Sequence, residues 1–273
     1  MLRDAVLAAG LVSPSHVHEP ERASRDALRL VHTERYIDAL ASGTLSDAEQ
    51  RRIGLPWSEA LVERSFRAVG GTCEAAAAAL DLGLAMNLAG GTHHAFPDHG
   101  EGFCVFNDVA VAIRMLQRSG RIRRAAVIDL DVHQGNGTHA IFAGDPTVFT
   151  FSMHGGRNYP FHKVAGSLDV ELADGTGDET YLDLLASALP RVLSSSAPDL
   201  VIYLAGADPH EGDRLGRLCL TFGGLARRDA MVLDACREVG IPVAITIAGG
   251  YGRDIADSVQ VHVNTLRIAA AIS

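Results

Sequence analysis

Acidic and imidazole side chains are concentrated in one short segment, Asp129-Leu-Asp131-Val-His133. On an extended strand, residues two apart point to the same side, so all three side chains would share one face. Two carboxylates and an imidazole placed so closely would be poorly satisfied unless a cation joined them, although aspartates alone could instead cap a loop. A further carboxylate, Asp208, follows a later apolar run. Asp131, His133 and Asp208 therefore predict a divalent metal site with a position left open for water, as in catalytic zinc sites.

Two adjacent histidines, His93 and His94, follow another apolar run. In an extended segment they would point to opposite sides, whereas on a turn both could reach one pocket. A single histidine is more often structural than catalytic, but a pair beside a metal cluster favours proton transfer. Asp129 is placed to accept the Nδ1 proton of one histidine, and Asn136 could orient the other.

Three aromatic residues could complete such a site. Tyr251 follows Gly249 and Gly250, which let the backbone turn closely at a strand end, and its phenol could hydrogen-bond a developing oxyanion. Without a metal site, packing would be the better interpretation of Tyr251. Phe103 and Tyr159 lie in loops, where they could be core residues or could line a narrow channel for an extended, largely apolar chain.

The elements that must position these residues follow from the hydrophobic pattern. Apolar runs rich in Val, Ile and Leu alternate with helix-period stretches from about residue 56 onward. Strands of this kind, alternating with helices, predict an α/β fold with a parallel sheet covered on both faces. No linker or repeat interrupts the pattern, so we predict a single domain over residues 1–273. We expect strands at 84–89, 125–130, 148–151, 200–204 and 243–247, and helices at 1–10, 56–82, 107–119, 178–193, 225–239 and 254–271.

The strongest candidate residues all come at the carboxyl ends of these predicted strands. This is the edge at which open α/β sheets bind ligands. Chance would have spread the polar residues over both ends of the strands. The convergence therefore predicts an active site without reference to any protein family.

Composition excludes several classes of partner. The 273 residues include 24 Lys+Arg against 33 Asp+Glu, which gives a formal net charge of −9. This balance argues against duplex nucleic acid and against an anionic membrane surface. No apolar run approaches the roughly 20 residues of a membrane span. The four cysteines show no CxxC spacing and no signal peptide precedes them, so we expect a reduced, cytoplasmic chain.

Several longer motifs carry a family resemblance. They are Gly90-Gly-Thr-His-His-Ala-Phe-Pro97, Gly102-Phe-Cys-Val-Phe-Asn-Asp108, Asp129-Leu-Asp-Val-His-Gln-Gly-Asn-Gly137, Gly206-Ala-Asp208 and Gly249-Gly-Tyr251. In this order they resemble the zinc-dependent histone deacetylase superfamily, which includes bacterial acetylpolyamine amidohydrolases and acetoin-utilisation proteins. Gln134 and the stretch after Ser152 look most similar to the class IV branch and its bacterial relatives.

The resemblance, which covers the chain from about residue 17, implies a fold. It implies the three-layer αβα sandwich of arginases and deacetylases with a central parallel sheet of eight strands, of which five or six are visible in the sequence. It also implies that the family's N-terminal strand and loop, one wall of the entrance, are missing here.

The resemblance assigns the metal and proton-transfer residues. Asp131, His133 and Asp208 match the ligands of one Zn²⁺. His94 matches the residue usually taken as general base and then acid, whereas His93 matches a largely electrostatic histidine.

The partners of the histidines and the oxyanion donor are implied in the same way. Asp129 and Asn136 match the hydrogen-bond partners of the two histidines. Some branches have Asp in place of Asn136, so His94 would be held by a neutral partner and be less basic. Tyr251 matches the tyrosine that polarises the scissile carbonyl.

A substrate tunnel and a second cation site are also implied. Phe103 and Tyr159 match aromatic walls of an acyl-lysine tunnel, and Gly102 matches a backbone acceptor for the substrate amide. Gly249 and Gly250 would border the same tunnel. The backbone around Asp129, Asp131 and His133, with Ser152, matches a monovalent-cation site, commonly K⁺.

The implied activity is hydrolysis of the amide of an acyl-lysine or acylated amine, in a peptide or small molecule, releasing acetate or another carboxylic acid. An acetylpolyamine amidohydrolase is the first alternative, because Asp98, His99 and Glu101 lie in a loop that could give the entrance an acidic rim.

Two more distant alternatives remain open. A dimanganese ureohydrolase with the same sheet topology would need further bridging aspartates, and after Asp208 only Asp213 follows, outside ligand spacing. A non-catalytic protein that binds an acylated ligand would have the same metal site, although no required residue is missing here.

Overall fold

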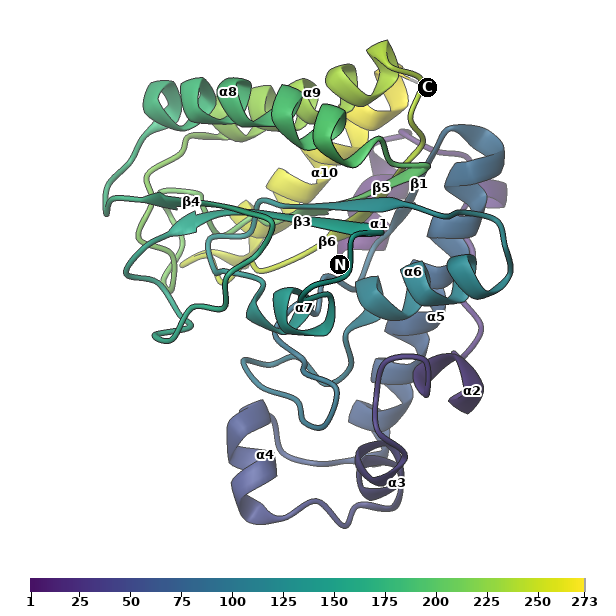
Figure 1. Ribbon diagram of the computed structural model, residues 1–273. Helices are drawn as coiled ribbons and strands as arrows, with labels where there is room; N and C mark the ends of the chain where they lie inside the picture. The colour runs from purple at the N-terminus through teal and green to yellow at the C-terminus, as the bar shows by residue number, and fades with distance from the viewer. Residues whose placement is uncertain (273) are drawn as a thin grey trace.

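The computed structural model of the protein describes residues 1–272, in which a parallel sheet lies between two layers of helices (Figure 1). The six strands lie in the order β1-β6-β5-β2-β3-β4. They are β1 (Leu84–Asn87), β2 (Ala125–Asp129), β3 (Val148–Gly155), β4 (Leu168–Leu172), β5 (Leu200–Ala205) and β6 (Val243–Ile247). The predicted α/β sandwich is confirmed, with six strands in the described residues in place of the eight that the resemblance implies.

The helices account for most of the remaining chain, with a 3₁₀ turn at Pro14–His16. They are α1 (Leu2–Ala8), α2 (Arg25–Leu28), α3 (Glu34–Ser42), α4 (Asp47–Ile53), α5 (Glu59–Leu82), α6 (Asp108–Arg118), α7 (Asn136–Ile141), α8 (Asp178–Ser196), α9 (Phe222–Glu238) and α10 (Ile255–Ile272). Within residues 1–272, no helix is both long and apolar enough to cross a membrane. All four cysteines are unpaired.

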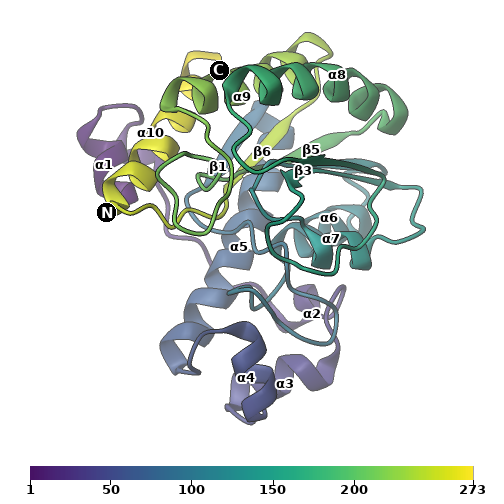
Figure 2. The same ribbon diagram turned by 90° about the vertical axis from the view of Figure 1, so that its left-hand side faces the viewer.

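The central strands β2 and β5 are buried on both faces because alternate residues point into different helix layers. In β2, Ala125 and Val127 join the core beneath α5 and α6, whereas Ala126 and Ile128 join the core beneath α8 and α9. Figure 1 shows these helix layers above and below the sheet. Figure 2 shows α1 beside α10, where Val6 packs in a small separate cluster.

Most predicted elements match the structure within a few residues, and the differences have local causes. Strand β3 continues to Gly155, so Ser152 lies within the strand and not after it. Strand β4 was not predicted, because this edge strand has the alternating sequence Leu-Asp-Val-Glu-Leu, most of it only partly buried, and is not an apolar run. The short helix α7 was also missed.

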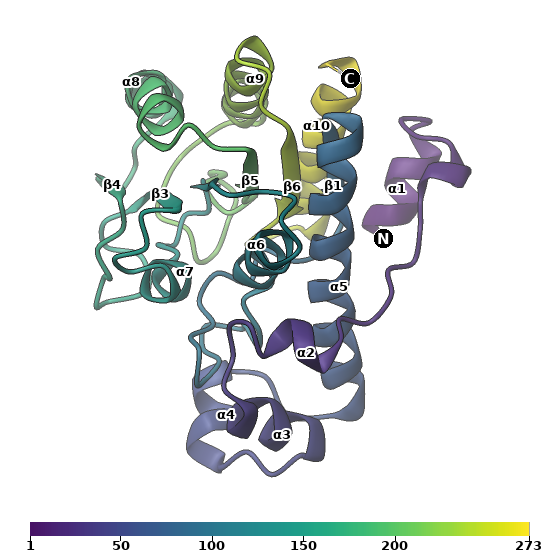
Figure 3. The same ribbon diagram turned by 45° about the vertical axis from the view of Figure 1, so that its right-hand side comes forward.

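The helices α2, α3 and α4, which the sequence pattern did not reveal, lie at the far end of α5 from the sheet (Figure 3). They support a loop that carries candidate site residues. The backbone N–H groups of Gly102 and Phe103 donate to the carbonyls of Arg52 and Ile53, at 3.2 and 2.8 Å. The carboxyl end of α4 therefore fixes the position of the Gly102-Phe103 loop.

A buried cation joins two neighbouring strands on the other side of the sheet. Arg228 of α9 is fully buried, and its Nη1 donates to the carbonyls of Gly206 at 2.6 Å and Leu130 at 3.3 Å. These carbonyls lie at the carboxyl ends of β5 and β2. The charge is compensated by Asp229, whose Oδ1 also accepts the hydroxyl of Tyr203.

Replacing Arg228 by methionine is expected to destabilise the fold by about 3–5 kcal/mol, because the buried Asp229 would lose its counter-charge. Chemical denaturation measures the change in the free energy of unfolding. The adjacent Arg227→Met is a matched control, since its ion pair with Glu179 is exposed and worth about 0–1 kcal/mol. Equal losses in the two variants would contradict a structural role for the buried pair.

Candidate metal and catalytic site

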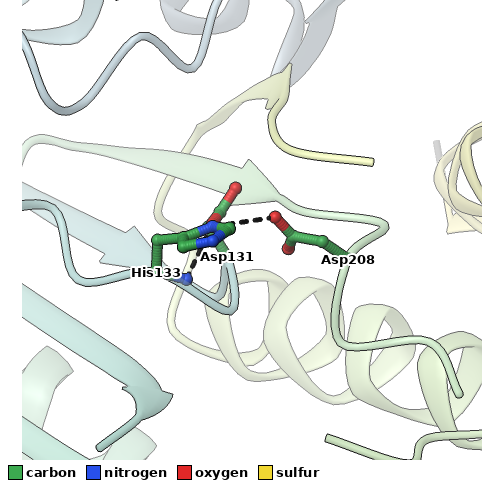
Figure 4. A group of neighbouring side chains, drawn as sticks. All are labelled: Asp131, His133 and Asp208. Atoms are coloured by element: carbon green, nitrogen blue, oxygen red, sulfur yellow. Dashed lines mark hydrogen bonds and ion pairs between the residues drawn. The ribbon is translucent and has the colours of Figure 1, made fainter. Parts of the chain in front are cut away.

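The three predicted metal ligands converge at the carboxyl ends of neighbouring strands. Asp131 and His133 follow β2 and Asp208 follows β5, which is paired with β2 in the sheet. Their ligand atoms all lie within 4.8 Å of one another. His133 Nδ1 is 2.9 Å from Asp131 Oδ1 and 3.1 Å from Asp208 Oδ2 (Figure 4). The structure thus brings Asp208 next to His133, which lies 75 positions away along the chain.

The backbone holds the two carboxylates in place. Strand β2 ends at Asp129, so a turn, and not the extended strand that we expected, brings Asp131 and His133 together. Asp131 Oδ1 accepts the N–H of His133 at 2.8 Å, and Asp208 Oδ1 accepts the N–H of Val132 at 2.8 Å. The N–H of Gly249 donates to Asp131 Oδ2 at 2.6 Å.

The donor set fits a divalent cation. Asp131 and Asp208 are almost fully buried, and burial together with the charge of Asp131 raises the pKa of Asp208. A buried cation would relieve this repulsion. Two carboxylates and one imidazole are oxygen and nitrogen ligands of the kind that Zn²⁺ takes. Within residues 1–272 this is the only group of three such side chains close enough to hold an ion, so the described residues offer no second ligand set for a dimanganese site.

Replacing Gly249 by alanine is expected to weaken metal binding about 10–100-fold, the range seen when groups that hold ligands are changed. A methyl group there would overlap Asp208 Oδ2 and approach Asp131 Oδ2 at 2.7 Å. Titration with a competing chelator measures the affinity. Gly240→Ala is a control, because a Cβ there meets nothing within 4 Å, although its positive φ adds strain. Unchanged affinity in Gly249→Ala would contradict the close approach.

The tandem histidines share a turn, as one of the two sequence interpretations required. Their ring centroids lie 4.1 Å apart, and both side chains are buried. His93 Nδ1 is 2.6 Å from Asp129 Oδ2, and His94 Nδ1 is 2.7 Å from Asn136 Oδ1. Each histidine therefore has one polar partner on Nδ1, a carboxylate for His93 and an amide for His94.

The two partners give the histidines different protonation states. Burial by itself would lower the pKa of His93, but the charges of Asp129 and Asp131 outweigh it and raise the pKa to about 9. Burial and the neighbouring His93 and His133 hold the pKa of His94 well below its ordinary value. These surroundings favour the protonated form of His93 and the neutral form of His94, which can accept a proton.

Two of the predicted tunnel residues, Gly102 and Tyr159, lie against His94. Gly102 has a positive φ of 56°, and a Cβ on it would meet His94 Cδ2 at 2.6 Å, so this position requires glycine. The rings of Tyr159 and His94 pack edge to face, with their centroids 4.9 Å apart. Phe103 packs instead against Tyr251, with ring centroids 5.7 Å apart, and is 41% exposed. Burial raises the pKa of the Tyr251 phenol, which keeps its proton available for donation.

Of the remaining predicted residues, Gly249 and Gly250 lie beside the metal ligand Asp208, and Ser152 lies beside Asp129. The carbonyl of Gly249 accepts the N–H of Ala207 at 2.7 Å, and a Cβ on Gly250 would meet Ala207 at 3.1 Å, next to Asp208. Ser152 is the register partner of Asp129 in the sheet, and its Oγ is 3.0 Å from His154 Nδ1. The monovalent-cation site at these residues stays a prediction.

Three supporting residues were missed or misinterpreted from the sequence. Asp213 was considered only as a metal ligand, but its Oδ2 accepts the N–H of Tyr251 at 2.6 Å. Glu101 was expected at an acidic rim, but its side chain turns inward to the Tyr159 hydroxyl. Lys163 donates to the two carbonyls that flank Tyr159. The first two contacts join residues 38 and 58 positions apart, and no local spacing indicates such pairs.

Comparison with known proteins assigns the chain to a family. The model of the histone deacetylase domain matches residues 1–266. The chain belongs to the histone deacetylase family. Its fold agrees with solved structures of this family. One is an HDAC homolog complexed with SAHA, with 27% identity and a TM-score of 0.85, over 99% of this chain and 76% of that chain. Another is the HDA15 HD domain, with 25% identity and a TM-score of 0.82, over 99% and 80%.

Related sequences include a histone deacetylase and an acetoin utilization protein. An uncharacterized protein of Picosynechococcus is 50% identical over 96% of this chain and 87% of its own length. Histone deacetylase 2 of Arabidopsis thaliana is 35% identical over 93% of this chain and 69% of its own. The acetoin utilization protein AcuC of Bacillus subtilis is 35% identical over 74% and 58%. Family membership makes the protein a hydrolase of the deacetylase type.

Proposed function

We propose that the protein is a zinc-dependent deacylase that hydrolyses the amide of an acyl-lysine or acylated amine and releases acetate or another carboxylic acid. The observation that carries this proposal is the buried Asp131-His133-Asp208 group beside His94, a neutral histidine held through Nδ1. An ion site and a proton acceptor together are what amide hydrolysis by water needs.

The side chains of the site divide the reaction between them. Zn²⁺, when bound by Asp131, His133 and Asp208, would polarise the amide carbonyl and lower the pKa of water at the open position. His94 accepts the proton of the attacking water at Nε2, and the same proton later goes to the leaving amine. The Tyr251 hydroxyl donates a hydrogen bond to the oxygen on which negative charge develops.

The substrate proposal rests on the surroundings of this group. The rings of Phe103 and Tyr159 give the site apolar surfaces that suit an extended acyl or alkyl chain. The relatives named histone deacetylase and AcuC support an acylated amine, in a peptide or small molecule, as the substrate. The inward direction of Glu101 removes one carboxylate from the acidic rim that would favour a polyamine.

An activity panel combined with metal analysis tests the proposal. Acetyl-lysine peptides, long-chain acyl-lysine peptides and acetylpolyamines are assayed with added zinc and with a chelator. We expect about one zinc per chain and turnover that the chelator abolishes and zinc restores. Two bound manganese ions would favour a ureohydrolase, and binding of acetylated peptide without turnover would favour a non-catalytic protein. Either result would overturn the proposed function.

A further inference from the structure

A carboxylate outside the predicted catalytic group contacts the residue that holds His94. The Glu101 side chain is 16% exposed. Its Oε1 accepts Asn136 Nδ2 at 2.6 Å and the Tyr159 hydroxyl at 2.9 Å, and its Oε2 is 3.7 Å from His99 Nε2. Burial would raise the pKa of Glu101, but the neighbouring His99 and the hydrogen bonds from Asn136 and Tyr159 outweigh it and lower the pKa. Glu101 is therefore an anion that only accepts hydrogen bonds.

An anion at this place decides which way the Asn136 amide faces. An amide has a donating end and an accepting end, whereas a carboxylate can only accept. With Nδ2 directed to Glu101, Oδ1 must face His94 Nδ1, as the distance of 2.7 Å between them shows. That oxygen in turn requires the proton of His94 to be on Nδ1. The lone pair is then on Nε2, on the other edge of the ring.

We propose that Glu101 is a positioning residue that fixes the reactive tautomer of His94 through the Asn136 amide. The inference rests on the proposed function, because it concerns the nitrogen that accepts the proton of water. Without Glu101, the Asn136 amide could rotate and donate its Nδ2–H to His94 Nδ1. The ring proton would then be on Nε2, where it would block proton transfer. Asn136 carries no charge, so the negative charge lies on Glu101, which acts on His94 through the Asn136 amide.

Glu101→Gln tests this chain of contacts, since glutamine has nearly the same shape but also a donating end. We expect kcat to fall about 10–100-fold, with zinc content and melting temperature close to wild type. Glu179→Gln, an exposed exchange of the same type, is the matched control and should leave kcat unchanged. Tyr159→Phe removes the other hydrogen bond to Glu101 Oε1, and we expect it to change KM more than kcat. Wild-type kcat in Glu101→Gln would overturn the proposal.

A charge exchange distinguishes tautomer control from a merely structural contact. In Glu101→Gln/Asn136→Asp the carboxylate moves next to His94 and accepts its Nδ1 proton directly, while the glutamine donates to the new carboxylate. We expect the double variant to have a higher kcat than either single variant, because Asn136→Asp alone places two carboxylates at hydrogen-bond distance. A double variant whose fold-loss of kcat equals the product of the two single losses would contradict the proposal.

The tautomer itself can be observed without any turnover. Nitrogen-15 chemical shifts of His94, in the full chain with and without zinc, report which ring nitrogen carries the proton. We expect Nδ1–H in the wild type and a mixture of tautomers in Glu101→Gln. The same tautomer in both proteins would overturn the inference even if the wild type is an active deacylase. An inactive wild type with the expected shifts would instead overturn the proposed function alone.

Discussion

Replacing His94 by alanine is expected to lower kcat about 10²–10⁴-fold, the usual contribution of a general acid–base residue. His94 is neutral because burial and the cationic His93 beside it lower its pKa, so it is ready to accept a proton from water. None of its nitrogens is among the ligand atoms of the metal group. The loss should therefore appear in kcat of a fully zinc-loaded enzyme, measured with the best substrate of the panel.

The comparison needs variants that separate chemistry from folding. His16→Ala, at an exposed position far along the chain from the site, is expected to keep wild-type activity. Metal analysis and thermal unfolding of His94→Ala show whether the site and the fold are intact. Turnover close to wild type in a zinc-loaded His94→Ala protein would exclude His94 as the base and leave His93 as the next candidate.

The second large effect is expected from Tyr251→Phe, which removes one hydroxyl and nothing else. Loss of one donor to an oxyanion typically lowers kcat about 10²–10³-fold. The backbone of Tyr251 is held by Asp213, and its ring packs against Phe103, so phenylalanine should occupy the same position. We expect KM and zinc content to change little, because the hydroxyl acts on charge that develops only during the reaction.

Asp213→Asn provides a graded comparison for this second prediction. Asparagine keeps Oδ1, which accepts the N–H groups of Leu215 and Gly216, but the NH₂ group in place of Oδ2 cannot accept the N–H of Tyr251. We expect a smaller loss of kcat than in Tyr251→Phe, since the hydroxyl is still present. A Tyr251→Phe enzyme with full kcat would show that the phenol donates no hydrogen bond in the transition state.

Local pattern was sufficient to predict most of the sheet and the place of the site. Strands β2, β5 and β6 are short apolar runs followed by polar residues, so both the elements and their functional ends are visible in the sequence. The triad of Asp131, His133 and Asp208 was found because residues that follow neighbouring parallel strands meet at one edge. The edge strand β4 and the helices α2 to α4 were not found, because partly exposed elements have weaker apolar patterns.

The fold class, the ligand set and the two histidines follow from the amino-acid sequence, because spacing along strands and turns decides which of these residues meet. The residues that support them become visible only in the folded chain: Arg228 across β2 and β5, Asp213 behind Tyr251, and Glu101 behind Asn136. These contacts join segments that lie far apart along the chain, and the periodicity of the sequence does not indicate which partner a single charged residue contacts. The direction of each side chain is set by packing after the elements have assembled, so the proton positions at the site depend on the fold as a whole.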